Sequence, residues 1–397
     1  MPYLYFDYNA TSPLNKQVKA AMQSALEEYG NPSSMHETGK RAKRLVKQAR
    51  QHAASMLGCK PDQLVLTSGG TEANNLAIQG RLQAYWDNPG HIITSAIEHP
   101  SVLEVCRRLT RINGFELTIL PVGKQGRISL DALEQAIRPD TQLITVMLAN
   151  NEVGTIQPIR QVAELAQRHG IFFHCDAVQA AGKLTLDVEE LGVDALSISA
   201  HKFGGPKGVG ALFVKDRATI QPVLCGGGQE GGLRSGTENV LAIIGMGEAC
   251  KVAADYVQEA AQSGRRLQQR LMALLADQVN DVSFNGAVVD DSRHGNADGQ
   301  AYPCLWNTVN MRIAGVDGQE LAELLSMDHE TAVSVGSACS SGKQQHHSHV
   351  LTAMGLPSSE IESSIRISFG RETTDADIEQ LVQAITSVVH SLRTYVV

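Results

Sequence analysis

The feature that most constrains the fold is an alternation, between about residues 62 and 215, of short apolar runs with helix-length segments. Strands that are buried on both faces have continuous apolar runs, and helix-length connections between them are typical of βαβ units. The runs are Leu64–Thr67, His91–Ala96, Leu117–Pro121, Leu143–Ala149, Ile171–Cys175, Ala195–Ser199 and Ala211–Val214. This pattern predicts an α/β protein with a mainly parallel, seven-stranded sheet, helices on both faces, and ligands at the carboxyl ends of the strands.

The length of the chain predicts a second, smaller part. A single hydrophobic core stops growing below 397 residues, so we expect one large and one small domain. A helical pattern from Gly247 to about Leu275 indicates the bridge into a C-terminal α+β portion. Residues 288–301 are rich in Asp, Gly, Asn and Ser, which is typical of a loop or an insertion.

Charge and cysteine content exclude several classes of function. A net charge of -8 and a pI of about 5.9 give no electrostatic reason to expect nucleic acid or an anionic membrane as partner. The N-terminus lacks a signal-peptide pattern and no apolar run approaches a membrane span, so we expect a soluble cytoplasmic protein. The 7 cysteines are scattered without a C-x-x-C pair, which predicts neither a disulfide framework nor a cysteine zinc site.

Two strand ends carry the most specific chemical signal. The run from Ile171 ends at Asp176, and the run from Ala195 ends at Ser199-Ala-His201-Lys202. A lysine at a ligand-binding edge can form a Schiff base, and a carboxylate there can keep a pyridine nitrogen protonated. Alone, Lys202 is more simply an exposed strand-end lysine and Asp176 a helix cap. Together, in one α/β context, they favour a site for pyridoxal 5'-phosphate (PLP).

Three glycine-rich segments are candidates for a phosphate site. Leu66-Thr-Ser-Gly-Gly70-Thr71-Glu predicts a strand that turns into a helix, whose first N–H groups suit a phosphate, although the same pattern also serves as a helix cap. Gly226–Gly231 matches G-x-G-x-x-G but is followed by a second polar loop, which argues against a Rossmann site. Gly336–Lys343 has the wrong glycine spacing for a P-loop.

A lone thiol stands in a segment of short, polar residues. A free cysteine is usually buried and inert, but Ser334-Val-Gly-Ser-Ala-Cys339-Ser-Ser-Gly has few large apolar residues to bury it. We therefore predict a mobile loop that carries a reactive Cys339. For Cys106, Cys175 and Cys250, which lie in apolar patterns, burial is the better interpretation. No acidic or cysteine ligands stand near the histidines at 346, 347 and 349, so we predict no metal site.

Taken together, these residues resemble the cysteine desulfurases, of the class V aminotransferase group within fold-type I PLP enzymes. The resemblance covers nearly the whole chain. Its motifs are Asp7-Tyr-Asn-Ala-Thr, Gly30-Asn-Pro-Ser-Ser-Met-His36, Thr67-Ser-Gly-Gly-Thr-Glu72, Glu98-His99, Asn150-Asn-Glu-Val-Gly154, Asp176 to Gln179, Ser199 to Lys202, Arg234-Ser-Gly-Thr-Glu-Asn239, Gly336-Ser-Ala-Cys339 and Ile365-Arg366-Ile-Ser-Phe-Gly-Arg371.

The resemblance implies a role for each site residue. Lys202 holds PLP and removes the α-proton of L-cysteine, and Cys339 takes the sulfur as a persulfide, leaving L-alanine. His99 stacks on the ring and assists proton transfer, Asp176 keeps the ring nitrogen protonated, and Gln179 bonds the ring hydroxyl. Asn151 and Arg366 hold the substrate carboxylate. Further expected phosphate ligands are Gly70, Thr71, Ser199, His201 and, from a neighbouring subunit, Thr237, which implies a homodimer.

The resemblance also implies a domain division and a partner. A large PLP-binding domain would span residues 15–255. A small domain would combine residues 1–14 with 256–397 and carry the cysteine loop at about 333–348. A sulfur-acceptor protein for iron–sulfur cluster assembly, tRNA thiolation or another sulfur cofactor is expected. Val335 and the Gln-Gln-His-His-Ser-His run depart from the family pattern, which leaves the acceptor open. The alternative function is a selenocysteine lyase or C–S lyase on the same fold, without a protein persulfide on Cys339.

Overall fold

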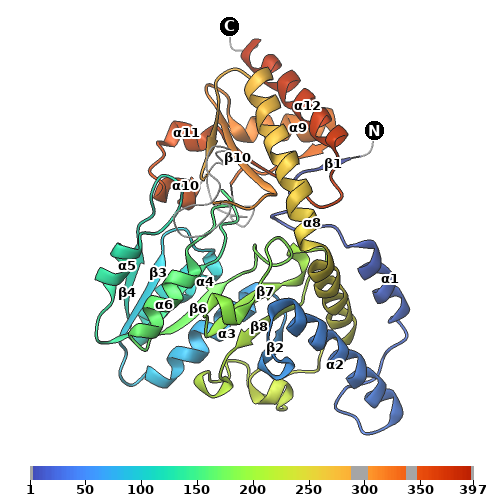
Figure 1. Ribbon diagram of the computed structural model, residues 1–397, viewed down its shortest axis with the longest axis vertical. Helices are drawn as coiled ribbons and strands as arrows, with labels where there is room; N and C mark the ends of the chain where they lie inside the picture. Colours follow the sequence, from blue (N-terminus) through green and yellow to red (C-terminus); the bar gives the residue numbers. More distant parts are fainter. Residues whose placement is uncertain (1–2, 288–302, 337–346, 395–397) are drawn as a thin grey trace.

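The computed structural model describes residues 3–287, 303–336 and 347–394. The described chain forms a large part and a smaller part that are joined by one long helix (Figure 1). Among the described residues, no helix combines the length and the apolar character needed to cross a bilayer. The segment 288–301 and most of the predicted cysteine loop, including Cys339, lie outside the described residues.

The large part is built on a seven-stranded sheet, as predicted. Its strands are β2 (Leu64–Thr67), β3 (His91–Ser95), β4 (Glu116–Leu120), β5 (Thr141–Met147), β6 (Phe172–Asp176), β7 (Ala195–Ser199) and β8 (Gly210–Val214), in the order β2-β8-β7-β6-β5-β3-β4. All neighbours pair in parallel except β8, which is antiparallel to β2 and β7. The connection from β7 to β8, residues 200–209, is too short for a parallel crossover, so the chain reverses there.

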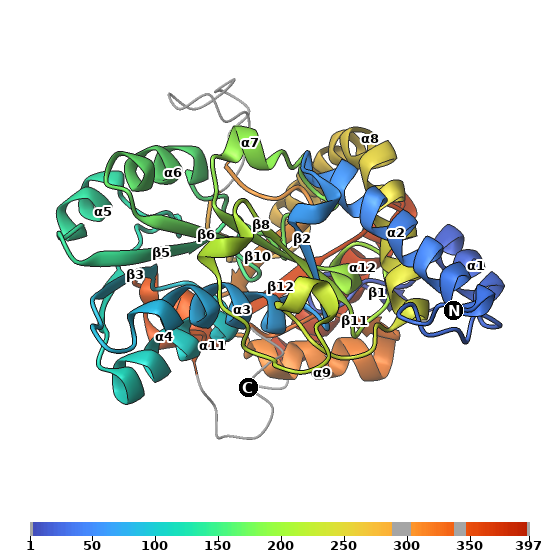
Figure 2. The ribbon, with the colours of Figure 1, turned by 90° about the horizontal axis from the view of Figure 1, so that it is seen from below.

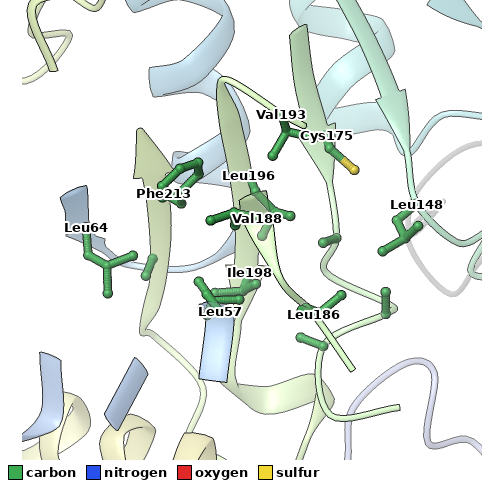
Figure 3. Packing of buried hydrophobic residues seen from close by; sticks show 14 of the residues in the cluster. Leu57, Leu64, Leu148, Cys175, Leu186, Val188, Val193, Leu196, Ile198 and Phe213 are labelled. Atoms are coloured by element: carbon green, nitrogen blue, oxygen red, sulfur yellow. The ribbon is translucent and has the colours of Figure 1, made fainter. Parts of the chain in front are cut away.

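Helices cover both faces of this sheet (Figure 2). One face carries α3 (Gly70–Leu82) and α4 (Pro100–Asn113), and the other carries α2 (Glu37–Leu57), α5 (Leu130–Ala136), α6 (Ile159–Arg168) and α7 (Val188–Leu191). Leu196 and Ile198 of β7 pack near Leu57 of α2 and Val188 of α7 (Figure 3). Alternate residues of β7 face opposite helix layers, and the whole strand is therefore buried, including the polar Ser197 and Ser199.

The smaller part has its own hydrophobic core. The three-stranded antiparallel sheet consists of β9 (Val282–Asn285), β10 (Thr308–Ile313) and β12 (Ser364–Ser368), and β1 (Leu4–Tyr5) pairs with β11 (Thr331–Ala332). The helices are α9 (Gly318–His329), α10 (His349–Ala353), α11 (Ser358–Glu362) and α12 (Asp375–Thr394), while α1 (Lys16–Ser24) packs on α8 (Val240–Gln278). Helix α8 spans both cores, with Cys250 in the larger and Ala260 in the smaller. The exact domain limits stay a prediction.

Candidate active site

One cavity of about 240 Å³ collects the polar strand ends. Asp176 ends β6, Ser199 ends the neighbouring β7, and Lys202 follows in a short 3-10 turn, so all three lie at the same edge of the sheet. Ten residues singled out from the sequence line this cavity: Gly70, Thr71, His99, Asn151, Asp176, Gln179, Ser199, His201, Lys202 and Arg366. The structure therefore brings together residues from both of its parts.

Asp176 is held as a fixed carboxylate at the cavity wall. Its Oδ2 accepts a hydrogen bond from Asn74 Nδ2 at 2.7 Å, and its Oδ1 accepts one from the Val178 N–H at 2.9 Å. The same Asn74 nitrogen also donates to Ser101 Oγ at 2.9 Å. These neutral donors fix the carboxylate without neutralising it. A cationic ring N–H is the partner that such a carboxylate suits.

His99 has its proton position set by the helix that it caps. As the N-cap of α4, its Nδ1 accepts a hydrogen bond from the Ser101 N–H at 3.1 Å and lies 2.8 Å from Ser101 Oγ. Burial lowers the pKa of His99; the Asp176 carboxylate opposes this effect, and Lys202 adds to it. Since Nδ1 is an acceptor, the neutral imidazole carries its proton on Nε2. His99 can therefore donate or relay a proton through Nε2.

Lys202 is anchored by the N-terminal segment. Its Nζ donates to the main-chain oxygen of Ala10 at 2.9 Å and to that of Asn9. Asn9 is buried, and its side chain donates to the Asn151 carbonyl at 3.1 Å and to Thr308 Oγ1 at 2.8 Å. Asn9 thus joins the amine, the cavity wall and β10.

Arg366 enters the site from the smaller part of the molecule. This β12 residue is only 2% exposed, and its guanidinium donates to the Asn151 carbonyl at 2.9 Å and to Asp7 Oδ1 at 2.6 Å. Its buried Nε has no partner among the described residues. A buried guanidinium at a cavity wall with one donor unused is suited to a substrate carboxylate.

The turn before α3 fits a phosphate. Gly69 has a φ of +150°, which favours glycine, and a Cβ on Gly70 would lie 2.6 Å from Val178 Cγ2. The absence of side chains at Gly69 and Gly70 lets the backbone of this turn come close to the cavity. There the first N–H groups of α3 and the hydroxyls of Ser199 and Thr71 can bind an anion. Burial lowers the pKa of the neighbouring His201 to about 4, so at neutral pH it acts as a neutral donor or acceptor. With Asp176 for the ring and Lys202 for the aldehyde, the residues fit PLP.

One predicted site residue, Thr237, lies elsewhere. Thr237 does not line this cavity: it lines a separate one of about 180 Å³, together with Thr67 and Ser68. Arg234 of the same segment forms an ion pair with Glu72 of α3 at 2.7 Å. Cys339 lies outside the described residues, so its role stays a prediction. Within the described ranges no cluster of His, Cys, Asp or Glu could hold a metal ion.

Sequence reasoning missed the residues that hold the others in place. Asn74 donates to Asp176, and the Ser101 N–H donates to His99. The Asn9 main-chain oxygen accepts from Lys202. Asn74 stands one helical turn after Gly70, and Asn9 lies within the Asp7-Tyr-Asn run, so helical spacing and the motif itself offered a signal. The link between Asn9 and Lys202 joins segments 193 residues apart, and no local pattern could indicate it.

The comparisons with known proteins point to one family. The model of the family "Aminotransferase class-V" matches residues 4–381. The cysteine desulfurase IscS of Dictyoglomus turgidum is 42% identical over 98% of this chain and 95% of its own length.

Two solved structures resemble the chain in three dimensions. A NifS-like protein superimposes with a TM-score of 0.87 at 34% identity, covering 98% of this chain and 99% of its own. A structure described as SspA in complex with cysteine has a TM-score of 0.79 at 37% identity, covering 94% and 100% of the two chains. The chain therefore belongs to the aminotransferase class-V family, within its cysteine desulfurase group.

Proposed function

We propose that this protein is a PLP-dependent cysteine desulfurase that converts L-cysteine to L-alanine and leaves the sulfur as a persulfide on Cys339. The observation that carries the proposal is the convergence of Lys202, Asp176 and His99 on one cavity that Arg366 closes from the other part of the molecule. Supporting it, one structural neighbour is described as a complex with cysteine, and a relative carries the name cysteine desulfurase.

Different residues would hold the cofactor, bind the substrate and move protons. Lys202 would hold the cofactor, Asp176 its ring nitrogen, and the turn at Gly70 its phosphate. When bound, PLP supplies an electron sink for the charge left on the substrate α-carbon. Arg366 binds the substrate carboxylate, Lys202 Nζ takes the α-proton as general base, and His99 Nε2 moves a proton. The buried surroundings of His99 keep its imidazole neutral, as this role requires.

The sulfur step uses a second nucleophile. The Cys339 thiolate attacks the substrate sulfur, so a sulfur–sulfur bond forms while the carbon–sulfur bond of the substrate breaks. The electron pair of that bond stays with the carbon skeleton, which gains protons to become L-alanine. One cysteine and one thiol give one alanine and one persulfide, and no external oxidant is needed.

The persulfide sulfur would then pass to an acceptor protein. Iron–sulfur cluster assembly or another sulfur cofactor is the expected destination, and the cytoplasm the expected location. We further propose a homodimer in which Thr237 serves the partner's phosphate site. In support, Thr237 lies apart from the cavity of its own chain, and the Glu72–Arg234 ion pair ties its segment to the start of α3.

The decisive experiment maps sulfur after a brief exposure of the purified protein to L-cysteine. Mass spectrometry should find one added sulfur atom on Cys339, with alanine formed in the same tube. Cys339→Ser should lose both, while Cys225→Ser, which alters an exposed thiol elsewhere, should keep both. Alanine or pyruvate without the adduct would indicate a lyase instead, and a protein without the absorption band of bound PLP would contradict the proposal altogether.

A further inference from the structure

A second lysine, Lys183, lies buried behind the cavity. It stands 4 residues after Gln179, in the turn that follows β6, and its Nζ donates to the Gln179 main-chain oxygen at 2.9 Å and to Gln179 Oε1 at 3.1 Å. Its own backbone is fixed at both ends, because its N–H bonds the Ala180 carbonyl at 3.0 Å and its carbonyl accepts from Trp306 Nε1 at 2.9 Å. The ammonium is therefore held in one place.

A lysine in this position is costly. Both acceptors are neutral carbonyl oxygens, and the charged groups that act on it, Lys202 and Arg366, are themselves cations. Burial, with these two cations, lowers the pKa of Lys183 to about 7. An apolar residue would avoid this desolvation. Packing alone does not explain a lysine here, which points to a function at the adjoining Gln179.

Lys183 determines which end of the Gln179 amide faces the site. When protonated, Lys183 can only donate, so the end of the amide that it contacts must be the oxygen Oε1. The amide nitrogen is then left at the opposite end, where it donates to the Asn9 carbonyl at 2.9 Å. Lys202 Nζ donates to that same carbonyl. The N–H groups of Gln179 thus lie at the oxygen that also binds the catalytic amine, rather than facing away from it.

We propose that Lys183 is a positioning residue, which holds the Gln179 amide so that its nitrogen, and not its oxygen, is presented to the ring oxygen of the cofactor. This inference rests on the proposed function. A donor at that oxygen stabilises its ionised form and lowers the pKa of the nitrogen that links Lys202 to the ring. A reversed amide would present a lone pair and raise this pKa.

The test follows the pKa of that link through the absorption band of the bound cofactor, in a double-mutant cycle of Lys183→Met and Gln179→Ala. We expect each single variant to raise the pKa by about one unit, and the double variant to shift it no further than the larger single shift. Lys183→Gln, which keeps an N–H for Oε1, should shift it by less than Lys183→Met. Lys251→Met, at an exposed lysine of α8, is the matched control and should leave it unchanged.

Three results would overturn the inference. Additive shifts would mean that Lys183 acts independently of Gln179. Equal shifts in Lys183→Met and Lys183→Gln would mean that the lost charge, and not the amide orientation, is responsible. A Lys183→Met protein with a lower melting temperature but an unchanged link pKa would make Lys183 merely structural. Should Lys183→Met not fold, Lys183→Gln must shift the pKa by less than Gln179→Ala does.

A different result would refute the proposed function. A wild-type protein that binds no PLP refutes that function, and this inference with it. A wild-type protein that shows the band and forms alanine, but gives any of the three results above, refutes the inference alone.

Discussion

Replacing Glu98 by glutamine should make the protein more stable, and increasingly so as the pH rises. Glu98 precedes His99 and is completely buried. Its Oε1 accepts from Ser95 Oγ at 2.5 Å and from the Met147 N–H at 3.0 Å, while Oε2 has no partner among the described residues. Burial, which outweighs these hydrogen bonds, raises the pKa of Glu98 to about 8. The folded protein therefore keeps a proton here that the unfolded chain releases.

The direction and magnitude of the predicted change in stability follow from this difference in proton binding. Below the unfolded pKa, near 4.5, both states are protonated and the stability is independent of this group. Between that value and pH 8, only the folded state holds the proton, so the free energy of unfolding falls by about 1.4 kcal/mol per pH unit. Glutamine keeps the Oε1 acceptor and does not titrate. The Glu98→Gln advantage should thus grow by about 3 kcal/mol between pH 5 and pH 7.

Urea unfolding of both proteins at several pH values, followed by circular dichroism, measures this difference. Glu104→Gln, at an exposed glutamate of α4, is the control and should show no comparable trend. A stability difference between Glu98→Gln and the wild type that stays constant with pH would show that Glu98 is ionised in the folded protein and refute the argument. A loss of stability at every pH would contradict the predicted stabilisation.

Three further predictions concern the cavity. Arg366→Lys keeps the charge but loses the planar guanidinium that contacts Asp7 and Asn151, so kcat/KM for L-cysteine in steady-state kinetics should fall about 10- to 100-fold, mainly through KM. An unchanged KM would show that Arg366 does not bind the substrate carboxylate. Asn74→Ala leaves Asp176 and Ser101 without their shared donor, so it should lower the free energy of unfolding by about 1–3 kcal/mol and weaken PLP binding in a fluorescence titration. Undiminished PLP affinity would contradict the role of Asn74 in holding Asp176. Gly70→Ala places a Cβ 2.6 Å from Val178 Cγ2 and should weaken PLP binding in the same titration. The control Gly123→Ala, whose Cβ would meet its nearest atom at 3.9 Å, should not, and equal affinities of the two variants would refute the close fit at the turn before α3.

Local patterns were sufficient to predict the large sheet. An apolar run between helix-length segments reports burial on both faces, and such burial is a property of the strand itself. The same logic placed Asp176, Ser199 and Lys202 at one edge, because adjacent parallel strands end together. The antiparallel direction of β8 was not specified by any residue. It follows from the short connection that precedes it, residues 200–209.

The sequence by itself determined the strand ends, the glycine turn before α3 and the family, because each depends on residue type and spacing along a continuous segment. Only the tertiary structure decided how the site is closed and tuned. The Asp7–Arg366 ion pair joins residues 359 positions apart. The lowered pKa of Lys183 and the proton held by Glu98 arise from burial between packed elements. Desolvation and long-range pairing depend on what surrounds a side chain in space, and local sequence carries no record of those surroundings.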